Sequence, residues 1–483
     1  MKNMRLAIIL AACCALLSPG FAAAQTWTDM SDFIAELGNA KTPITVTNIP
    51  TGGMDNLDVF ALEGGTTTGA HPLFVASCGP VMTQDSCPPL GDGFTTFVDI
   101  SPPGGTFFVS VVAWGPTFGR HRRPPHWEAF VIDGGTLLLS HNTRDGANAW
   151  SGWAPLGGPP TGMNGGPCIL SNGGNTPQAI SQAKGMISVF VVGCDNNLWN
   201  IYFPKKGGGW SDWVNVTAKA FPPANNIADS GPSVVYSNFR TATHPPSKQI
   251  HVIVADKNSN IWDINYAADA SNNYNPKNGA NWFFIDTGET TATLGNIIDS
   301  PGAAAAVSPP GDIALFNNAA PSFSDNGARP IDGVQIIERS AAHGGAFVAA
   351  VDSLTVNAGL SPPADDMLVT PTPVTFGTPG TDCDSFHSCR NGVFFLNGAQ
   401  NIQYSIFGVG VPGTVWDRSF GIQTVGTAGD IFDVNPAAVV SQQGADAGKL
   451  VYVFTGRKDL TNTLCPGNGD DECGTIFYTT VTP

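Results

Sequence analysis

The chain has 483 residues and a formal net charge of −16, and only 12% of its residues are charged. Gly and Pro number 57 and 38, which fits short strands joined by many turns and does not fit an architecture of long helices. An acidic surface repels phosphate backbones, so we expect no nucleic-acid partner.

The first predicted element is a secretory signal peptide, residues 1–24. Lys2 and Arg5 provide its positive n-region, and the apolar run at 6–17 is too short to span a bilayer. Loss of these two cations changes the net charge from −16 to −18. Lipidation at Cys13 is a minor alternative, because only about five apolar residues would precede it. We therefore expect a secreted or periplasmic protein with no membrane span.

Removal of the signal peptide leaves eight cysteines in an oxidising compartment. No pair has CxxC spacing and no histidine cluster accompanies them, so disulfides are favoured over a metal site. We expect four disulfides, no metal and no cofactor. In sequence order the pairs are Cys78–Cys87, Cys168–Cys194, Cys383–Cys389 and Cys465–Cys473. The last pair also encloses three carboxylates without EF-hand spacing, which favours an exposed acidic turn over a calcium site.

Helical periodicity is confined to residues 28–40, which are predicted as a short helix. The rest consists of apolar runs of five to eight residues separated by Gly, Pro, Asn and Asp, a pattern typical of strands. Turn residues such as Asp195-Asn196-Asn197 divide several runs into hairpins. The predicted hairpins are 129–142, 189–203, 251–266 and 394–407.

A Trp-bearing strand is predicted after each hairpin, at Trp150–Trp153, Trp210–Trp213, Asn281-Trp282 and Val415-Trp416. A further short strand is predicted before three of them, beginning at Val109, Gly166 and Gly231. The unit of four strands recurs every 60 to 70 residues: Trp153 and Trp213 are 60 apart. Such units stack radially as propeller blades, because one four-stranded sheet cannot bury both of its faces alone.

Weaker copies of the unit flank the clear ones, at 56–101 and 434–481, and the copy at 299–370 matches worst. The last copy ends before its outermost strand, and we predict that the segment 44–49 (ITVTNI) supplies that strand and closes the ring. The sequence thus predicts one all-β propeller of six or seven four-stranded antiparallel blades over residues 44–483. Residues 25–43 form a separate N-terminal segment in this interpretation.

The clear repeats resemble a known family. The pattern GP-x-VVS, then x-VFV-x-G-x-DNNLW, then GGW-S-x-W-x-x-LGG is similar to the fucose-binding PLL-type bacterial propeller lectins and related tectonin-like repeats. The similarity is good over residues 109–287, fair over 391–425 and weak elsewhere. It implies a propeller with carbohydrate sites at or between blades. The chain departs from the family in its disulfides, its long insertions and its divergent fifth unit.

Sugar binding requires a flat apolar platform together with groups that hydrogen-bond hydroxyls. The recurring tryptophans are the candidate platforms, and packing of blade on blade is the competing explanation for each. The hairpin-tip residues Asp195, Asn196 and Asn197 are better explained as turn residues. The candidate platforms are Trp150, Trp153, Trp199, Trp210, Trp213, Trp262 and Trp282.

The densest positive cluster is the segment RHRRPPH, which contains Arg120, Arg122 and Arg123. Three guanidinium groups in an acidic protein fit an anionic glycan, and a solvated surface loop is the alternative explanation.

No catalytic motif occurs in the chain, which argues against an enzyme. A pair of carboxylates for glycoside hydrolysis would have to come from residues that converge only on folding, such as Glu63, Glu128, Glu289 and Glu338. The leading interpretation is a secreted, lectin-like propeller with several glycan sites, for fucosylated or anionic sugars. A protein-interaction or cell-surface scaffold and a hydrolase are the two alternatives, and the sequence favours no oligomeric state.

Overall fold

A computed structural model shows the fold. It describes residues 27–30, 45–49, 54–62, 71–79, 87, 94–95, 97–114, 124–169, 176–183, 186–203, 208–217, 231–239, 247–255, 261–267, 281–284, 303–306, 313–319, 333–339, 347–353, 372–376, 390–396, 400–408, 422–426, 432, 434, 436–441, 448–458 and 474–482.

These residues form seven four-stranded antiparallel sheets. The first sheet contains β2 (Thr45–Asn48), β3 (Leu57–Leu62), β4 (Leu73–Cys78) and β5 (Val98–Asp99). The second contains β6 (Thr106–Trp114), β7 (His126–Asp133), β8 (Leu138–Asp145) and β9 (Ala154–Gly157). The third contains β10 (Gln178–Ala183), β11 (Met186–Val192), β12 (Leu198–Phe203) and β13 (Val214–Asn215). The fourth contains β14 (Ser233–Phe239), β15 (Ser247–Ala255), β16 (Ile261–Ala267) and β17 (Asn281–Phe284).

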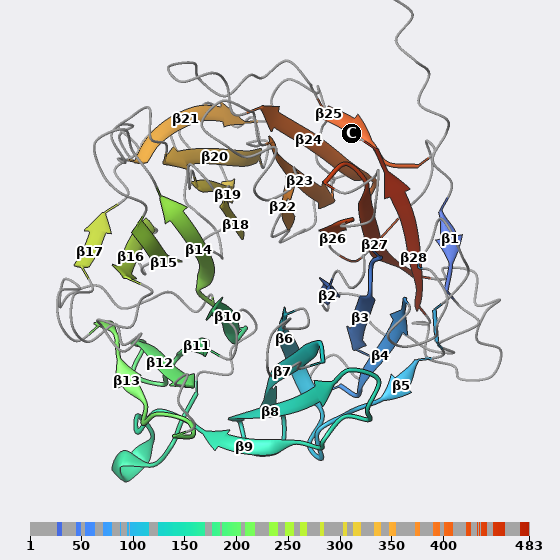
Figure 1. Ribbon diagram of the computed structural model, residues 1–483. Helices are drawn as coiled ribbons and strands as arrows, with labels where there is room; N and C mark the ends of the chain where they lie inside the picture. The colour runs from blue at the N-terminus through green and yellow to red at the C-terminus, as the bar shows by residue number, and fades with distance from the viewer. Residues whose placement is uncertain are drawn as a thin grey trace, which may run out of the picture.

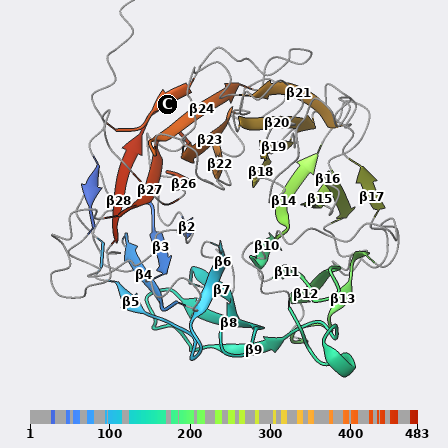
Figure 2. The ribbon, with the colours of Figure 1, turned by 180° about the vertical axis from the view of Figure 1, so that it is seen from behind.

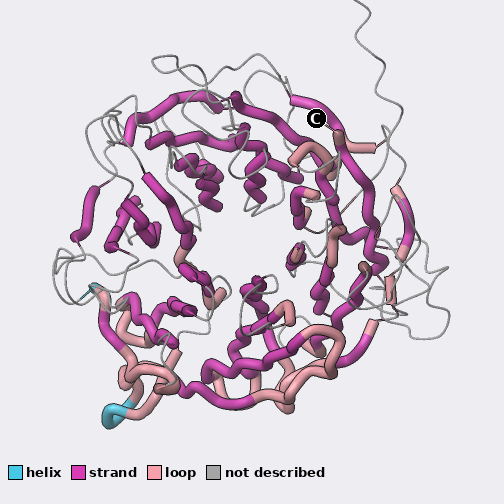
Figure 3. Tube along the Cα trace, viewed as in Figure 1, coloured by secondary structure: helices cyan, strands magenta, loops and turns pink. Residues whose placement is uncertain are grey.

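The remaining sheets follow the same order. The fifth contains β18 (Ala303–Ala306), β19 (Ile313–Ala319), β20 (Gly333–Arg339) and β21 (Phe347–Ser353). The sixth contains β22 (Thr372–Phe376), β23 (Arg390–Leu396), β24 (Ile402–Gly408) and β25 (Ile422–Thr424). The seventh contains β26 (Ala437–Val440), β27 (Val451–Lys458), β28 (Gly474–Val481) and β1 (Thr28–Asp29). A 3-10 turn at Met163–Gly165 lies between the second and third sheets in the chain (Figure 3).

The sheets are arranged as a ring around a central axis (Figures 1 and 2). The first strand of each sheet lies nearest the axis, and the innermost strands of successive sheets contact one another around the whole ring, from β2 through β26 and back to β2. The all-β propeller predicted from the sequence is confirmed, with seven sheets. Among the described residues, no helix is long and apolar enough to cross a membrane.

The second strands β3, β7 and β11 are buried on both faces along most of their length, which explains why most of their residues are apolar. In β7, Phe130 and Ile132 pack against Ile187 and Val189 of the third sheet. Ala129 and Val131 point to the other face and belong to the cluster shared with the first sheet. The core therefore lies between neighbouring sheets, in separate apolar layers, because each sheet is buried only by its neighbours.

Two of the predicted hairpin turns, at 133–135 and 195–197, are confirmed by their backbone geometry and hydrogen bonds. Asn196 has φ 57°, in the left-handed region that Asn tolerates. The Asp195 carboxylate accepts hydrogen bonds from the Asn197 backbone N–H (3.1 Å) and from the Trp199 indole N–H (3.1 Å). Asp133 plays the same part in the second sheet, accepting from the backbone N–H of Thr136 at 2.8 Å. These aspartates are turn residues, as predicted.

Ring closure differs from the prediction in one respect. An N-terminal strand does complete the last sheet, but it is β1, which pairs with Phe477 and Tyr478 of β28. The segment 44–49 instead supplies β2, the innermost strand of the first sheet. The prediction of a helix over 28–40 is wrong for Thr28 and Asp29, and residues 31–40 lie outside the described part of the chain.

Of two further strand predictions, one is wrong and the other lies outside the described residues. The strand predicted at Gly166 does not form the inner strand of the third sheet, which is β10. That segment is tied to the β11–β12 turn by the Cys168–Cys194 disulfide, and its Ile169 forms only an isolated bridge with Gly193. The predicted strand at Val415-Trp416 lies outside the described residues.

Two of the four predicted disulfides are present in the described residues, Cys78–Cys87 and Cys168–Cys194. The pairs Cys383–Cys389 and Cys465–Cys473 lie outside them.

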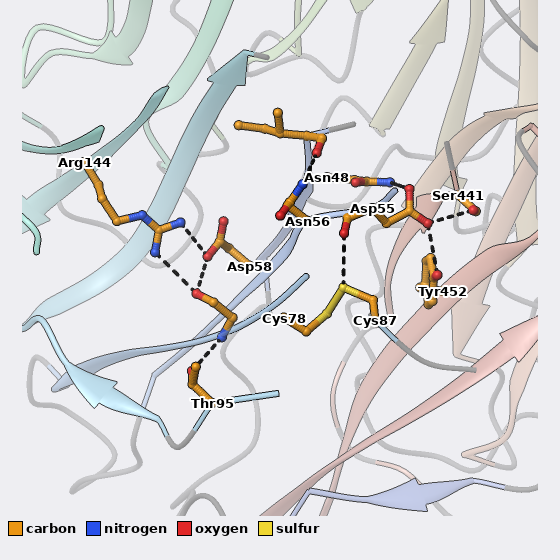
Figure 4. Close-up of a disulfide and its surroundings, with 12 residues drawn as sticks. Asn48, Asp55, Asn56, Asp58, Cys78, Cys87, Thr95, Arg144, Ser441 and Tyr452 are labelled. Carbon is orange, nitrogen blue, oxygen red and sulfur yellow. Dashed lines mark hydrogen bonds and ion pairs between the residues drawn. A yellow bond between two sulfur atoms is a disulfide. The ribbon is translucent and has the colours of Figure 1, made fainter. Parts of the chain in front are cut away.

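A buried hydrogen-bonded network joins the last sheet to the first, around the Asp55 carboxylate (Figure 4). Asp55 is fully buried and accepts hydrogen bonds from Asn48 Nδ2 (2.8 Å), Ser441 Oγ (2.7 Å) and the Tyr452 hydroxyl (3.0 Å). Asn48 Nδ2 also donates to the Val440 carbonyl at 3.1 Å. One carboxylate therefore connects side chains from the two sheets at which the ring closes.

Candidate functional site

The candidate site lies at the second junction, which we define as the contact between the second and third sheets. Four polar side chains of the second sheet gather there: His126 and Glu128 from β7, and His141 and Asp145 from β8. We call these four residues the histidine cluster. Two side chains from other segments flank it. Trp114 from β6 is paired in register with His126, and Trp210 comes from the loop before β13.

The register of the hairpin places these residues together. Phe130 lies opposite His141, so Glu128, two residues earlier on β7, reaches His141 diagonally on the same face. The distance from Glu128 Oε1 to His141 Nδ1 is 2.6 Å. His126 lies opposite Asp145, and its Nδ1 is 2.6 Å from Asp145 Oδ1. His126 Nε2 lies 3.5 Å from Glu128 Oε2. The histidine cluster is thus one chain of alternating carboxylates and imidazoles.

Aromatic rings enclose this chain on two sides. The Trp114 indole stacks on the His126 imidazole, with centroids 4.2 Å apart and an interplanar angle of 24°. Trp210 meets His141 edge to face at 5.4 Å and Phe130 at 5.7 Å. The cluster keeps contact with solvent: the His126 and His141 side chains are each 18% exposed and that of Asp145 is 58% exposed.

The neighbours set the charge of the cluster. Burial by itself would raise the pKa of Glu128, but the hydrogen bonds from His126 and His141 outweigh burial and hold this pKa below its ordinary value. Burial by itself would lower the pKa of His126, but the hydrogen bonds to Glu128 and Asp145 outweigh it and raise this pKa. Glu128 is therefore ionised at neutral pH.

An ionised Glu128 fixes the tautomer of neutral His141. Nδ1 must carry the proton that is donated to the carboxylate, so Nε2 carries a lone pair. Within the described part of the chain Nε2 has no hydrogen-bond partner, and it is not among the buried polar atoms. In this tautomer the second junction presents a hydrogen-bond acceptor to solvent, beside the Trp210 ring.

The linked pKa shifts predict a pH window for the stability that the cluster provides. The raised pKa of His126 provides stability that is present below 6.5 and is lost as pH rises through the folded-state value. The lowered pKa of Glu128 provides stability that is present above 4.5 and is lost as pH falls through the folded-state value. We expect the difference in unfolding free energy between the wild type and His126→Asn to be largest between these pH values. Urea unfolding across the range measures it, and a difference independent of pH would contradict the assignment.

The first junction, between the first and second sheets, repeats the aromatic arrangement, but a buried ion pair, shown in Figure 4, closes it to solvent. Trp150 meets Phe60 edge to face at 5.9 Å, as Trp210 meets Phe130 at the second junction. The acid here is Asp58, and its Oδ1 lies 2.7 Å from Arg144 Nη2. Both side chains are at most 2% exposed.

The guanidinium of Arg144 fills the space between two indoles at this junction. Its Cζ lies 4.1 Å from the Trp127 ring centroid and 5.0 Å from that of Trp150, within the range of cation–π attraction. Arg144 also donates to Ser77 Oγ at 3.3 Å. Burial raises the pKa of Asp58, and Arg144 opposes this rise. An ion pair within the protein thus occupies the first junction.

The fourth sheet carries a related pair at the equivalent diagonal. Ile253 lies opposite Asp263, and His251, two residues before Ile253, places Nδ1 2.9 Å from Asp263 Oδ2. Here the imidazole is on the second strand of the sheet and the acid on the third. In the second sheet the acid, Glu128, is on the second strand and the imidazole, His141, on the third. Both side chains are at most 1% exposed, so this pair is closed to solvent. Of the three junctions with such a pair in the described residues, only the second is open.

The predicted platforms fall at three junctions. Trp150 and Trp153 pack at the first, and the Trp153 indole N–H donates to the Ile100 carbonyl. Trp199, Trp210 and Trp213 pack at the second. Trp262 packs at the next junction, and Trp282 lies in β17, opposite Ile264. All of these tryptophans whose side chains are described are partly buried between sheets.

The predicted cation cluster of Arg120, Arg122 and Arg123 lies outside the described residues. The sequence named Glu128 only as one of four acids and His126 only as the last residue of the RHRRPPH segment. It gave no role to His141, Trp114, Asp58 or Arg144. The spacing of Glu128 and His141 around the predicted 129–142 hairpin was the available signal, because it places them diagonally across the two strands. Among the described residues, no group of three or more His, Cys, Asp or Glu side chains is arranged to hold a metal ion.

Comparison with known proteins assigns no family. No family model and no curated protein matches the chain. Among solved structures, the fucose-binding lectin of Aleuria aurantia, a six-bladed β-propeller, is 12% identical, with 81% of this chain and 97% of the lectin covered and a TM-score of 0.41. AofleA from Arthrobotrys oligospora is 11% identical, with 85% and 93% covered and a TM-score of 0.40.

A subtype N11 neuraminidase-like protein of A/flat-faced bat/Peru/033/2010 (H18N11) is 9% identical, with 95% of this chain and 94% of that protein covered and a TM-score of 0.36. These scores assign neither a family nor a ligand to this chain. The resemblance of the repeats to PLL-type lectins therefore stays a prediction.

Proposed function

We propose that the protein is a secreted, lectin-like propeller that binds a glycan at the second junction. The observation that carries this proposal is the His141 Nε2 acceptor, which Glu128 orients and which lies beside the Trp210 ring. A pyranose offers an apolar C–H face for an indole and hydroxyl donors for an acceptor at its rim. In this proposal Trp210 and His141 provide the two groups, and the second junction is the solvent-accessible one of the three junctions compared above.

The remaining predicted platforms extend this proposal to several sites. Trp262 and Trp282 mark further junctions, and several weak sites on one ring would raise avidity. Secretion follows from the predicted signal peptide. The arginines at 120, 122 and 123 lie between β6 and β7 in the sequence. Because they are positively charged, we propose anionic glycans as ligands in addition to fucosylated ones.

A glycan array followed by calorimetry tests the proposal on the oxidised mature chain. We expect Trp210→Ala and His141→Ala each to weaken binding of the selected glycan by at least about tenfold, or about 1.4 kcal/mol. Trp150→Ala is the matched control, because Trp150 packs at the equivalent position of the closed first junction. It should leave binding unchanged if circular dichroism shows a folded chain.

Two outcomes would contradict this assignment of the site. Equal loss of binding in Trp150→Ala and Trp210→Ala would mean that packing of the sheets, and not the second junction, is what binding requires. No binding to any neutral, fucosylated or anionic glycan would reject the lectin proposal and favour a protein-interaction scaffold. The number of glycans bound per chain tests multivalency.

The Glu128–His141 pair also favours a second candidate function, hydrolysis. A carboxylate that orients an imidazole with an open Nε2 is the arrangement of a general base. Turnover of chromogenic glycosides or esters that is lost in His141→Ala would support this alternative.

A further inference from the structure

The two described disulfides differ in their exposure to solvent. Cys78 and Cys87 are fully buried and belong to the apolar core that joins the last sheet to the first. Cys168 and Cys194 are both partly exposed. Exchange with an external thiol begins when a thiolate attacks one sulfur of the disulfide, so the reagent must reach that sulfur. Of these two disulfides, Cys168–Cys194 is therefore the one that a reagent in solution can approach.

The Cys168–Cys194 disulfide ties residues 158–168, which we call the exposed loop, to the turn between β11 and β12. The loop contains the 3-10 turn, which projects away from the ring, and Met163 in this turn is 91% exposed (Figure 3). The Cys168 backbone N–H donates to the Pro159 carbonyl at 2.9 Å. Because this hydrogen bond lies within the loop, it does not attach the loop to the ring.

Thr161 links the exposed loop to the turn without a covalent bond. Its hydroxyl accepts a hydrogen bond from the Cys194 backbone N–H at 3.1 Å and donates to the Cys168 carbonyl at 2.8 Å. Ile169, directly after the loop, is 1% exposed and belongs to the apolar cluster of the second junction. The loop therefore has a buried anchor at its end, whereas its described link to the turn consists of the disulfide and the Thr161 hydroxyl. A segment held in this way can open locally while the sheets stay folded.

From these observations we propose that Cys168–Cys194 is a thiol–disulfide exchange site, at which an external dithiol reduces the folded protein and releases the exposed loop. One thiolate of the dithiol attacks one sulfur of the disulfide, the bond between Cys168 and Cys194 breaks, and the other sulfur leaves as a thiolate. The second thiol of the dithiol then resolves the mixed disulfide. The two cysteines gain two electrons and two protons, and the dithiol is oxidised to a disulfide. This inference does not depend on glycan binding.

Differential alkylation of the full oxidised chain during treatment with dithiothreitol tests the proposal, because peptide mass spectrometry reads each cysteine separately. We expect Cys168 and Cys194 to be alkylated at least about tenfold faster than Cys78 and Cys87. Equal rates would mean that reduction requires unfolding of the ring, and they would overturn the proposal. Faster reduction of the buried pair would overturn it as well.

Hydrogen exchange measures the release of the exposed loop. After selective reduction we expect the amides of residues 158–168 to exchange at least about tenfold faster, while those of β11 stay protected. Cys168→Ser combined with Cys194→Ser is the matched variant, and its loop should exchange like that of the reduced wild type without added dithiol. The reduced wild type provides the same measurement if this variant does not fold. Selective reduction that leaves exchange in the loop unchanged would overturn the release.

Thr161 provides a check on local opening as the route to exchange. Thr161→Val removes the hydroxyl between the loop and the turn, so it should accelerate reduction of Cys168–Cys194 by about threefold or more. Thr161→Ser keeps the hydroxyl and is the matched control, with an expected rate equal to that of the wild type. An unchanged rate in Thr161→Val would reject local opening of the loop as the step that admits the dithiol.

Discussion

Replacement of Arg144 by methionine is expected to destabilise the propeller by about 3 to 5 kcal/mol, because it leaves the Asp58 carboxylate buried without its counter-ion. Methionine approximates the length of the arginine stem, so the loss reports mainly the charge and its hydrogen bonds. Asp58 is buried, and its contacts with Arg144 and Ser77 would be reduced to the one with Ser77. The free energy of unfolding in urea at about pH 7 measures the effect.

The sign of the pH dependence provides a specific check on this prediction. The pKa of Asp58 is already raised by burial and would rise further without Arg144. For an acid with a raised pKa, stability is greatest below the unfolded value of 3.8 and is lost as pH rises through the folded value. The deficit of Arg144→Met should therefore shrink towards about pH 4, where Asp58 takes up a proton.

A double variant completes the test of the ion pair. Asp58→Asn combined with Arg144→Met removes both charges, and its stability should lie above that of Arg144→Met alone. If the double variant were less stable than Arg144→Met by the full cost of Asp58→Asn, the two residues would not be coupled. The ion pair would then have no part in joining the first and second sheets.

Replacement of Asp55 by alanine is expected to cost about 3 to 5 kcal/mol, since several buried donors would lose their acceptor together. The donors belong to Asn48, Ser441 and Tyr452, which come from both sides of the closure. Asp99→Ala is the matched control, because Asp99 is exposed and accepts only from the neighbouring Ser101. That control should change stability by no more than about 0.5 kcal/mol.

Hydrogen exchange would locate the effect of the Asp55 variant. We expect the amides of β2 and β28 to lose protection before those of β11 or β15, because the network spans the closure and does not reach the opposite sheets. Uniform loss of protection in all seven sheets would show that closure and the rest of the ring unfold as one unit.

The four-stranded repeat could be predicted from the sequence, because the burial and the turns that produce it depend on short segments of the chain. The second strand β11 is buried on both faces, so the run 189–192 is apolar without alternation, and Asp195 and Asn196 mark the turn that follows. The strand that closes the ring could not be predicted in this way. A two-residue strand such as β1 carries almost no periodic signal, and only its pairing with β28 identifies it.

Only part of the candidate site was predicted, because only residues that recur along the chain form a pattern in the sequence. The tryptophans recur at fixed spacing and were recognised, but recurrence reflects packing between sheets, which Trp150 and Trp210 share. The residues that make the two junctions different, Arg144 and His141, do not recur. Their roles depend on which acid the neighbouring strand presents, and this is a property of register and not of composition.

The closure of the ring by β1 has a consequence for the order of folding. Thr28 pairs with Tyr478, a separation of 450 residues, whereas the other strands of each sheet pair with neighbours in the chain. Contacts of such long range form late, because the entropy of closing the loop must be overcome first. Until then β28 is an edge strand with unpaired backbone groups, open to pairing with another chain. Completion of the ring is thus also the step that protects a partly folded chain from aggregation.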